Sequence, residues 1–333
     1  MKTTLRLLIP ALAAIIALPA VAQEPKRVIV CSVTTGFRHS SIGIAEKTLQ
    51  KLADESHAFT IVDFARQPEV QVPHKPNKPA DLKPDADDKA KTKYEADLKK
   101  YNDEIAKWTP EIEQKAKEAE AKLKADMDAS LAKLSPQNLI DKKIDGVIFA
   151  NTTGDLPLPD RDGFIKWIED GHAFMGMHSA SDTYHGYPAY LKMLGGEFET
   201  HKAQVPADIV VADPEHPATK GLPNPWNLKR EEMYHIKNQD RSKVHVLLYM
   251  KHDPNETQKE VFFPVSWCRE AGKGRVFYTS LGHREDLWSD DPEMKGRENT
   301  PEISKQYQQH ILGGIKWALG LAQGNATPNP DVK

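Results

Sequence analysis

Short apolar runs alternate with amphipathic stretches along the first half of the chain. The runs predict strands at 27–33, 59–64, 146–150 and 173–177. Between them, apolar positions recur at helical spacing, as with Phe164, Trp167 and Ile168, and Ser40 or Ser41 suits an N-cap. Strands that alternate with helices predict a parallel, doubly wound sheet of the α/β class.

The second half changes to strands separated by loops. The strands expected there are 207–211, 244–250, 261–267 and 274–280. A last amphipathic helix, expected at 301–319, carries Tyr307, Ile311 and Ile315. The polar tail from Gln323 contains two prolines, and we expect it to be disordered.

Residues 67–134 interrupt this alternation. Their first part, 67–88, is rich in Pro, Lys and Asp and is typical of a linker. Apolar side chains then recur every three or four residues, and Thr109-Pro110 matches an N-cap followed by a first-turn proline. We therefore expect an inserted, charged helical hairpin. It is either a solvated structural insertion or, through residues 86–134, a coiled-coil contact with a partner or a second copy.

The N-terminus has the pattern of a bacterial-type secretory signal. Lys2 and Arg6 precede an apolar stretch, and Ala20-Val21-Ala22 fits a cleavage site. This pattern predicts a secreted, periplasmic protein with no membrane segment after cleavage. The expected divisions are a signal peptide at 1–22, an α/β domain at 23–66 and 135–322, the linker and helical insertion at 67–134, and the tail at 323–333.

Charge and cysteine content narrow the function classes. The 45 Lys and Arg residues are scattered among 48 Asp and Glu, so no basic patch indicates a nucleic-acid partner. Cys31 and Cys268 lie in separate apolar runs, and neither has a CxxC neighbour, which disfavours a thiol redox centre. Pairing of the two remains open, although buried free thiols are favoured.

The segment from Gly176 to Asp182 carries the strongest chemical signal. An apolar strand delivers His178 onto a turn of small residues, which is the layout of a nucleophile elbow. Histidine is a poor acyl nucleophile, but it is a good metal ligand, general base or proton donor. Serine catalysis through Ser179 or Ser181 is disfavoured, because neighbours in sequence rarely form a triad.

Further polar residues follow the predicted strands, where open α/β sheets bind their ligands. The candidates are Arg38, His39, Asn151, Thr152, Asp155, His178, Asp182, Tyr184 and His283. Among them His39, His178 and His283, with Glu232 or Asp182, would make a three-histidine-plus-carboxylate set for a divalent metal such as zinc. No HExxH-like spacing supports this metal set.

Several of these segments resemble the ThuA-like (trehalose utilisation) family of the class I glutamine amidotransferase-like superfamily. The similar stretches are Thr35–Ser40, Asn151–Asp155, Gly176–Asp182, Leu194–His201, Asp213–Ala218, Glu231–Tyr234, Pro264–Cys268 and Gly274–His283. The resemblance implies a flavodoxin-like three-layer sandwich with a mainly parallel sheet. It also implies that His178 stands where related amidotransferases have cysteine, which disfavours glutamine hydrolysis. The segment 67–134 and His235 depart from the family pattern.

The resemblance further implies a role in the metabolism of trehalose and related disaccharides, including 3-keto sugars. We therefore predict a lyase, isomerase or hydrolase that acts on a disaccharide or keto-glycoside. The catalytic residues would be His178, His39, Asp182 and Glu232. The substrate-binding residues would be Arg38, Asn151, Thr152, Asp155, Tyr184, His201 and Tyr234. The alternative is a non-catalytic carbohydrate-binding or accessory protein that uses the helical insertion to contact a partner.

Overall fold

The computed structural model describes residues 24–332, and of 257–259 the backbone alone. The predicted signal peptide, 1–22, therefore lies outside the described residues. Within the described part of the chain, no helix is long and apolar enough to cross a membrane.

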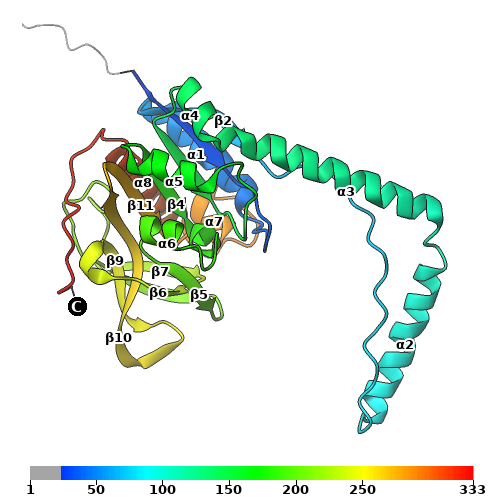
Figure 1. Ribbon diagram of the computed structural model, residues 1–333. Coiled ribbons are helices and arrows are strands. Elements are labelled where there is room, and N and C mark those ends of the chain that lie inside the picture. The colour runs from blue at the N-terminus through cyan, green and yellow to red at the C-terminus, as the bar shows by residue number, and fades with distance from the viewer. Residues whose placement is uncertain (1–23, 333) are drawn as a thin grey trace, which may run out of the picture.

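A nine-stranded sheet forms the centre of the molecule (Figure 1). In sheet order its strands are β2 (Phe59–Ala65), β1 (Lys26–Cys31), β3 (Gly146–Ala150), β4 (Ala173–Met177), β11 (Gly274–Thr279), β10 (Glu256–Ala271), β9 (His245–Asp253), β6 (Val205–Val211) and β7 (Trp226–Glu231). The first five are mutually parallel, and the remaining pairings are antiparallel. The sheet is therefore mixed, with its parallel half at the β2–β11 side.

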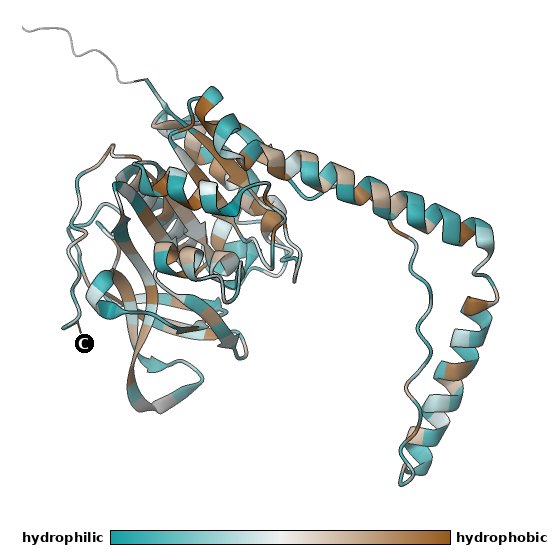
Figure 2. Cartoon of the chain, in the orientation of Figure 1, coloured by the Kyte–Doolittle hydropathy of each residue, from teal (hydrophilic) through white to brown (hydrophobic). Residues whose placement is uncertain are grey.

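Alternation along the parallel strands divides the core into two layers. In β1, Val28 and Val30 face one buried cluster, while Ile29 and Cys31 face the other. The first cluster is covered by α1 (Ile42–Ser56), α7 (Glu285–Trp288) and α8 (Pro301–Ala318). The second is covered by α4 (Pro136–Asp141), α5 (Arg161–Glu169) and α6 (Pro188–Leu194). Figure 2 shows the strands as apolar and the outer helix faces as polar. This is a three-layer α/β/α sandwich, and the predicted α/β class is confirmed.

Some short elements were not predicted from the sequence. The strands β5 (Glu197–His201) and β8 (Tyr234–Lys237) pair as a separate two-stranded antiparallel sheet. The 3₁₀ segments are η1 (Ala132–Leu134), η2 (His178–Asp182) and η3 (Arg241–Lys243). Because β5 and β8 have largely polar sequences, no apolar run marks them. They matter here because they bring two further polar side chains to the ends of the parallel strands.

The segment 67–134 forms an arm that leaves the body. After a stretch without helix or strand, α2 (Asp88–Ile105) and α3 (Pro110–Leu131) meet at Thr109, whose hydroxyl caps α3 as predicted. In Figure 1, α3 projects outward and α2 turns away from it at an angle. The expected charged hairpin is therefore not confirmed.

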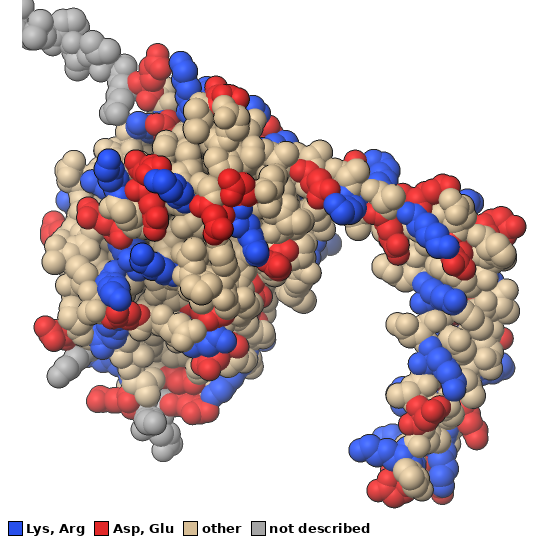
Figure 3. All heavy atoms as spheres, viewed as in Figure 1, with Lys and Arg blue, Asp and Glu red and all other residues tan. Residues whose placement is uncertain are grey.

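The outer surface of the arm is charged. Ion pairs four residues apart lie along α3, including Lys122–Asp126 at 2.5 Å and Lys124–Asp128 at 2.6 Å (Figure 3). Exposed pairs of this kind each add only about 0.3–0.5 kcal/mol to helix stability. At the base of the arm Leu131 is fully buried in the core. The arm is thus anchored by apolar packing at one end only.

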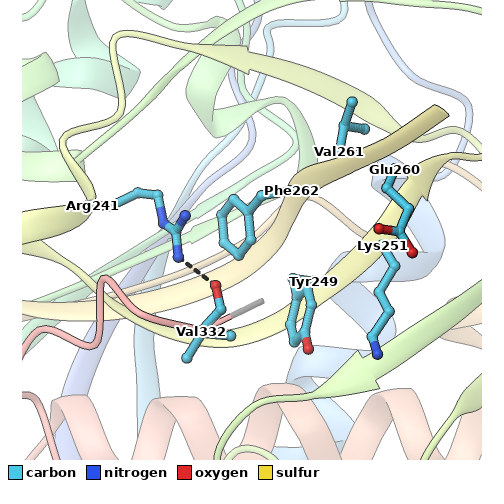
Figure 4. A pocket seen from close by; sticks show the side chains of 7 residues that line it. All are labelled: Arg241, Tyr249, Lys251, Glu260, Val261, Phe262 and Val332. Carbon is cyan, nitrogen blue, oxygen red and sulfur yellow. Dashed lines mark hydrogen bonds between the residues drawn. The ribbon is translucent and has the colours of Figure 1, made fainter.

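The C-terminal tail lies against the body, in contrast to the disorder expected from its composition. The Asn329 side chain exchanges two hydrogen bonds with the backbone of Val246, at 2.7 and 3.0 Å. Near its end the Arg241 guanidinium donates to the Val332 carbonyl oxygen and lies 3.8 Å over the Phe262 ring. These groups line a hollow of about 300 Å³ (Figure 4). Backbone hydrogen bonding therefore holds a segment that has few apolar side chains.

Candidate functional site

The histidine of the elbow lies at the carboxyl end of β4. His178 has a φ of 47°, in the left-handed region that side chains other than glycine rarely adopt, and η2 begins at this residue. The sharp turn predicted from the sequence is therefore present. The side chain is fully buried, and its Nδ1–H donates to the Ser280 carbonyl oxygen at 2.7 Å. This bond fixes the tautomer and leaves Nε2 with a lone pair.

Three groups converge on Nε2 of His178. His39, which follows β1, places its own Nε2 at 3.2 Å, and the Tyr234 hydroxyl of β8 lies at 3.0 Å. A carboxylate oxygen of Glu232, from the turn between β7 and β8, lies at 3.8 Å. The ring of His39 is edge-on to that of His178, with centroids 4.6 Å apart. Elements far apart in sequence therefore meet at one nitrogen.

Glu232 links the remaining histidines to this group. One of its oxygens lies 3.0 Å from Nδ1 of His283, which follows β11, and the other lies 2.9 Å from Nδ1 of His201 in β5. The neighbouring Glu231 is fully buried and accepts a hydrogen bond from the backbone N–H of His283 at 2.8 Å. The two adjacent glutamates thus hold His283 from its side chain and from its backbone.

The electrostatic environment keeps two of the histidines neutral. Burial, together with nearby His283, lowers the pKa of His39 to about 4. Burial and the adjacent His39 likewise hold the pKa of His178 well below its ordinary value. Burial also acts to lower the pKa of His283, but the Glu232 carboxylate outweighs it and raises that pKa. At neutral pH, His39 and His178 are therefore in the form that binds metals.

The donor set fits a divalent metal. One ligand atom each from His39, His178, Glu232 and His283 lies within 4.8 Å of the others. Zinc–nitrogen bonds of about 2.0–2.1 Å at a tetrahedral angle place two nitrogens about 3.3 Å apart. The 3.2 Å between the Nε2 atoms of His39 and His178 matches that separation. Ser280 supplies the hydrogen bond from behind that ligating histidines usually have.

Five of the residues predicted from the sequence meet in this site, which we call the histidine cluster: His39, His178, Glu232, Tyr234 and His283. His201, also predicted, lies at its edge with a side chain that is 46% exposed. Asp182 does not join them, because its carboxylate pairs with His185, which also contacts Glu197 at 2.8 Å.

The other predicted binding residues point elsewhere. Arg38 donates to the Ser32 carbonyl oxygen and lies near Glu46 and Glu69. Asp155 is in an exposed ion pair with Arg161. The remaining three are buried and bonded within the fold: Asn151 to Ser41 and Gly282, Thr152 to Thr183, and Tyr184 to Leu156. The structure therefore gives these five residues, Arg38 through Tyr184, a supporting role beside the cluster.

Two residues of the site were missed by the sequence reasoning. Burial raises the pKa of Glu231 to about 7, so a carboxyl close to neutral charge lies directly behind His283. Phe37 is 67% exposed beside His39, with ring centroids 4.9 Å apart. Phe37 could have been found from its place in the loop after the first strand, two residues before His39. Glu231 carried no signal, because nothing in the sequence says which of two adjacent glutamates is buried.

Serine and cysteine chemistry find little support in this geometry. The Ser179 hydroxyl lies 3.3 Å from Nδ1 of His39, but the other nitrogen of that ring faces His178 rather than a carboxylate. Cys31 and Cys268 are buried free thiols, as the sequence favoured. Burial raises the pKa of the Cys31 thiol to about 12, so it is not a nucleophile at neutral pH.

Fold and site together define a three-layer α/β protein with a histidine cluster at the carboxyl ends of its parallel strands. The profile of the ThuA family, described as trehalose utilisation, matches residues 95–318, more than half of the chain. The chain belongs to this family. The match includes His178, Glu232 and His283 and begins beyond His39. It also spans most of the segment 67–134, which the sequence analysis placed outside the family pattern.

Solved structures support the fold. A ThuA-like protein from Bacteroides uniformis is 17% identical with a TM-score of 0.55, covering 95% of this chain and 100% of that one. A ThuA-like protein from Parabacteroides merdae is 15% identical with a TM-score of 0.55, covering 93% and 99%. At these identities the likeness shows a shared fold. Among curated proteins, none matches this chain.

Proposed function

We propose that this protein is a carbohydrate-active enzyme in which His39, His178, His283 and Glu232 hold a divalent metal such as zinc. Its substrate would be a disaccharide or keto-glycoside. The observation that carries the proposal is the approach of four buried or half-buried ligand atoms to within 4.8 Å of one another. The description of the family, trehalose utilisation, supports a sugar substrate.

The cluster has the features of a prepared ligand set. His39 and His178 need lose no proton to bind a cation, because burial already lowers the pKa of each. Ser280 fixes the ring of His178, and Glu231 fixes the backbone of His283. A bound divalent metal would polarise a sugar carbonyl or hydroxyl oxygen as a Lewis acid.

Two side chains are suited to proton transfer and orientation. Burial raises the pKa of Tyr234 well above its ordinary value, so its hydroxyl keeps its proton and can donate to a substrate oxygen. His201 lies at the exposed edge, 2.9 Å from Glu232, where it can accept or return a proton on the solvent side. A carbonyl next to a C–H bond makes that proton acidic, so lyase, isomerase and hydrolase chemistry are all open to such a pair.

Location and partners are further parts of the proposal. The signal-like first 22 residues support a secreted, periplasmic protein. The projecting arm, with its charged surface, supports a contact through residues 86–134 with a partner or a second copy. A small-molecule sugar is the ligand proposed for the histidine cluster.

Metal content is the first test. Untagged protein starting at Gln23 should hold close to one equivalent of zinc after incubation and desalting, measured by mass spectrometry. His178→Asn should lose it, whereas the same substitution at exposed His57 should not. Failure of the wild type to retain any divalent metal would overturn the metal proposal.

Turnover is the second test. Zinc-loaded protein should convert trehalose or 3-keto-trehalose, and the His178→Asn variant should not. Equal conversion by both variants would remove His178 from the reaction. Saturable binding of these sugars without product would instead support the non-catalytic carbohydrate-binding alternative.

A further inference from the structure

The loop after β1 presents an exposed aromatic ring at the histidine cluster. We propose that the face of Phe37 is the platform on which a glucose-configured pyranose ring of the substrate stacks. This inference rests on the proposed sugar function and deepens it. Phe37 is 67% exposed, and among the described residues only Leu82 and Ile140 are other large apolar side chains so open to solvent.

The loop that carries the ring is held in place. The Thr153 hydroxyl donates to the Phe37 carbonyl oxygen at 2.8 Å, and the Thr35 N–H donates to the Thr153 carbonyl oxygen at 2.9 Å. A Cβ at Gly36 would lie only 3.2 Å from the Thr153 hydroxyl, so the two segments are in close contact. The exposed ring is therefore fixed in position before any ligand arrives.

The ring lies beside the reacting groups. It meets His39 nearly edge to face, with centroids 4.9 Å apart and an angle of 79° between the planes. His39 itself is only 6% exposed, and its Nε2 is 3.2 Å from that of His178. Phe37 therefore covers the outer side of a cluster ligand and leaves most of its own surface open. A ligand bound at the cluster can reach that surface.

The chemistry of a bare phenyl ring identifies the ligand part. Phe37 has no polar group, so it cannot bond to hydroxyls, but it offers an apolar face with negative quadrupole to C–H groups. A glucose-configured ring has equatorial hydroxyls and therefore two faces of axial C–H bonds. An axial hydroxyl, as in galactose at C4, places oxygen on one of those faces. Stacking on Phe37 thus favours the glucose configuration over the galactose configuration.

The test uses sugar affinity of the zinc-loaded mature protein, measured by calorimetry with trehalose and by saturation-transfer NMR with methyl α-glucoside and methyl α-galactoside. Phe37→Ala should weaken trehalose binding about tenfold, equivalent to about 1.4 kcal/mol. Phe37→Trp should restore it, and Phe37→Leu should not. Ile140→Ala removes an equally exposed apolar side chain from α4 and serves as the matched control. Zinc content should be the same in all four variants.

The outcomes separate this inference from the proposed function. Trehalose affinity unchanged in Phe37→Ala, or equal in the leucine and tryptophan variants, overturns the stacking role while the sugar function stands. An equal preference of wild type and Phe37→Ala for glucoside over galactoside also overturns it. Wild-type protein that binds zinc but none of the three sugars overturns both the inference and the proposed sugar function.

Discussion

The Nε2 atoms of His39 and His178 face each other at 3.2 Å, although the residues are 139 positions apart. The lone pair of His178 points at this contact, because its Nδ1–H is committed to the Ser280 carbonyl oxygen. Two ring nitrogens this close are stable only with a proton or a cation between them. The low pKa of both imidazoles disfavours a second proton, so the pair favours a metal cation.

Zinc affinity should rise with pH. The Glu232 carboxylate raises the pKa of His283 above its ordinary value despite burial, so zinc must displace a proton from this ligand as pH falls. His39, with a pKa of about 4, adds no such competition near neutral pH. Competition titrations with a chelator at pH 6, 7 and 8 should show weaker binding at the lower values. Affinity independent of pH over this range would contradict the assignment of His283 as a ligand.

Stability should fall on acidification. Burial lowers the pKa of His310 in α8 to about 4 in the folded state, against about 6.5 in the unfolded chain. The unfolded chain therefore takes up this proton first as pH falls from 6.5, and folded stability is lost until about pH 4. Each such histidine contributes a slope of up to about 1.4 kcal/mol per pH unit. His216 acts in the same direction.

Urea unfolding between pH 7.5 and 4.5 measures that slope. His310→Gln should lower it by about one proton, whatever its effect on absolute stability. The same substitution at exposed His57 is the matched control. A His310→Gln slope equal to that of the wild type would show that the buried imidazole takes up its proton without unfolding.

The sequence located the histidine cluster because parallel strands share one carboxyl edge. His39, His178 and His283 each directly follow an apolar strand, so predicting the strands was enough to place them together. The sequence did not give the direction of each side chain. Arg38 is next to His39, yet its guanidinium turns toward Ser32 and Glu46.

Polar elements were harder to predict than apolar ones. The β5–β8 pair has short strands with largely polar residues, so no alternation reveals it, yet it delivers His201 and Tyr234 to the site. The tail failed for a similar reason, since Asn329 holds it through backbone hydrogen bonds rather than apolar burial. Composition reports the hydrophobic effect and says little about such hydrogen bonds.

Two helical glycines should respond oppositely to alanine. A Cβ at Gly314 in α8 would lie 2.5 Å from the Phe277 ring, so Gly314→Ala should destabilise the fold by about 1–3 kcal/mol. At Gly43 in α1 nothing lies within 4 Å, and Gly43→Ala should stabilise by up to about 1 kcal/mol. Thermal unfolding of both variants checks the pair. An unchanged midpoint for Gly314→Ala would mean that the two layers are packed less tightly than described.

Tyr234→Phe should separate metal binding from catalysis. The substitution removes only the hydroxyl that lies 3.0 Å from Nε2 of His178, and the buried ring keeps its place. Zinc content should therefore be retained, while turnover of 3-keto-trehalose falls roughly a hundredfold through loss of a proton donor. Tyr307→Phe removes a comparable buried hydroxyl, bonded at 3.0 Å to the Leu281 carbonyl oxygen, and should affect stability but not turnover. Loss of zinc from Tyr234→Phe would instead make this tyrosine part of the ligand shell, and unchanged turnover would exclude it from proton transfer.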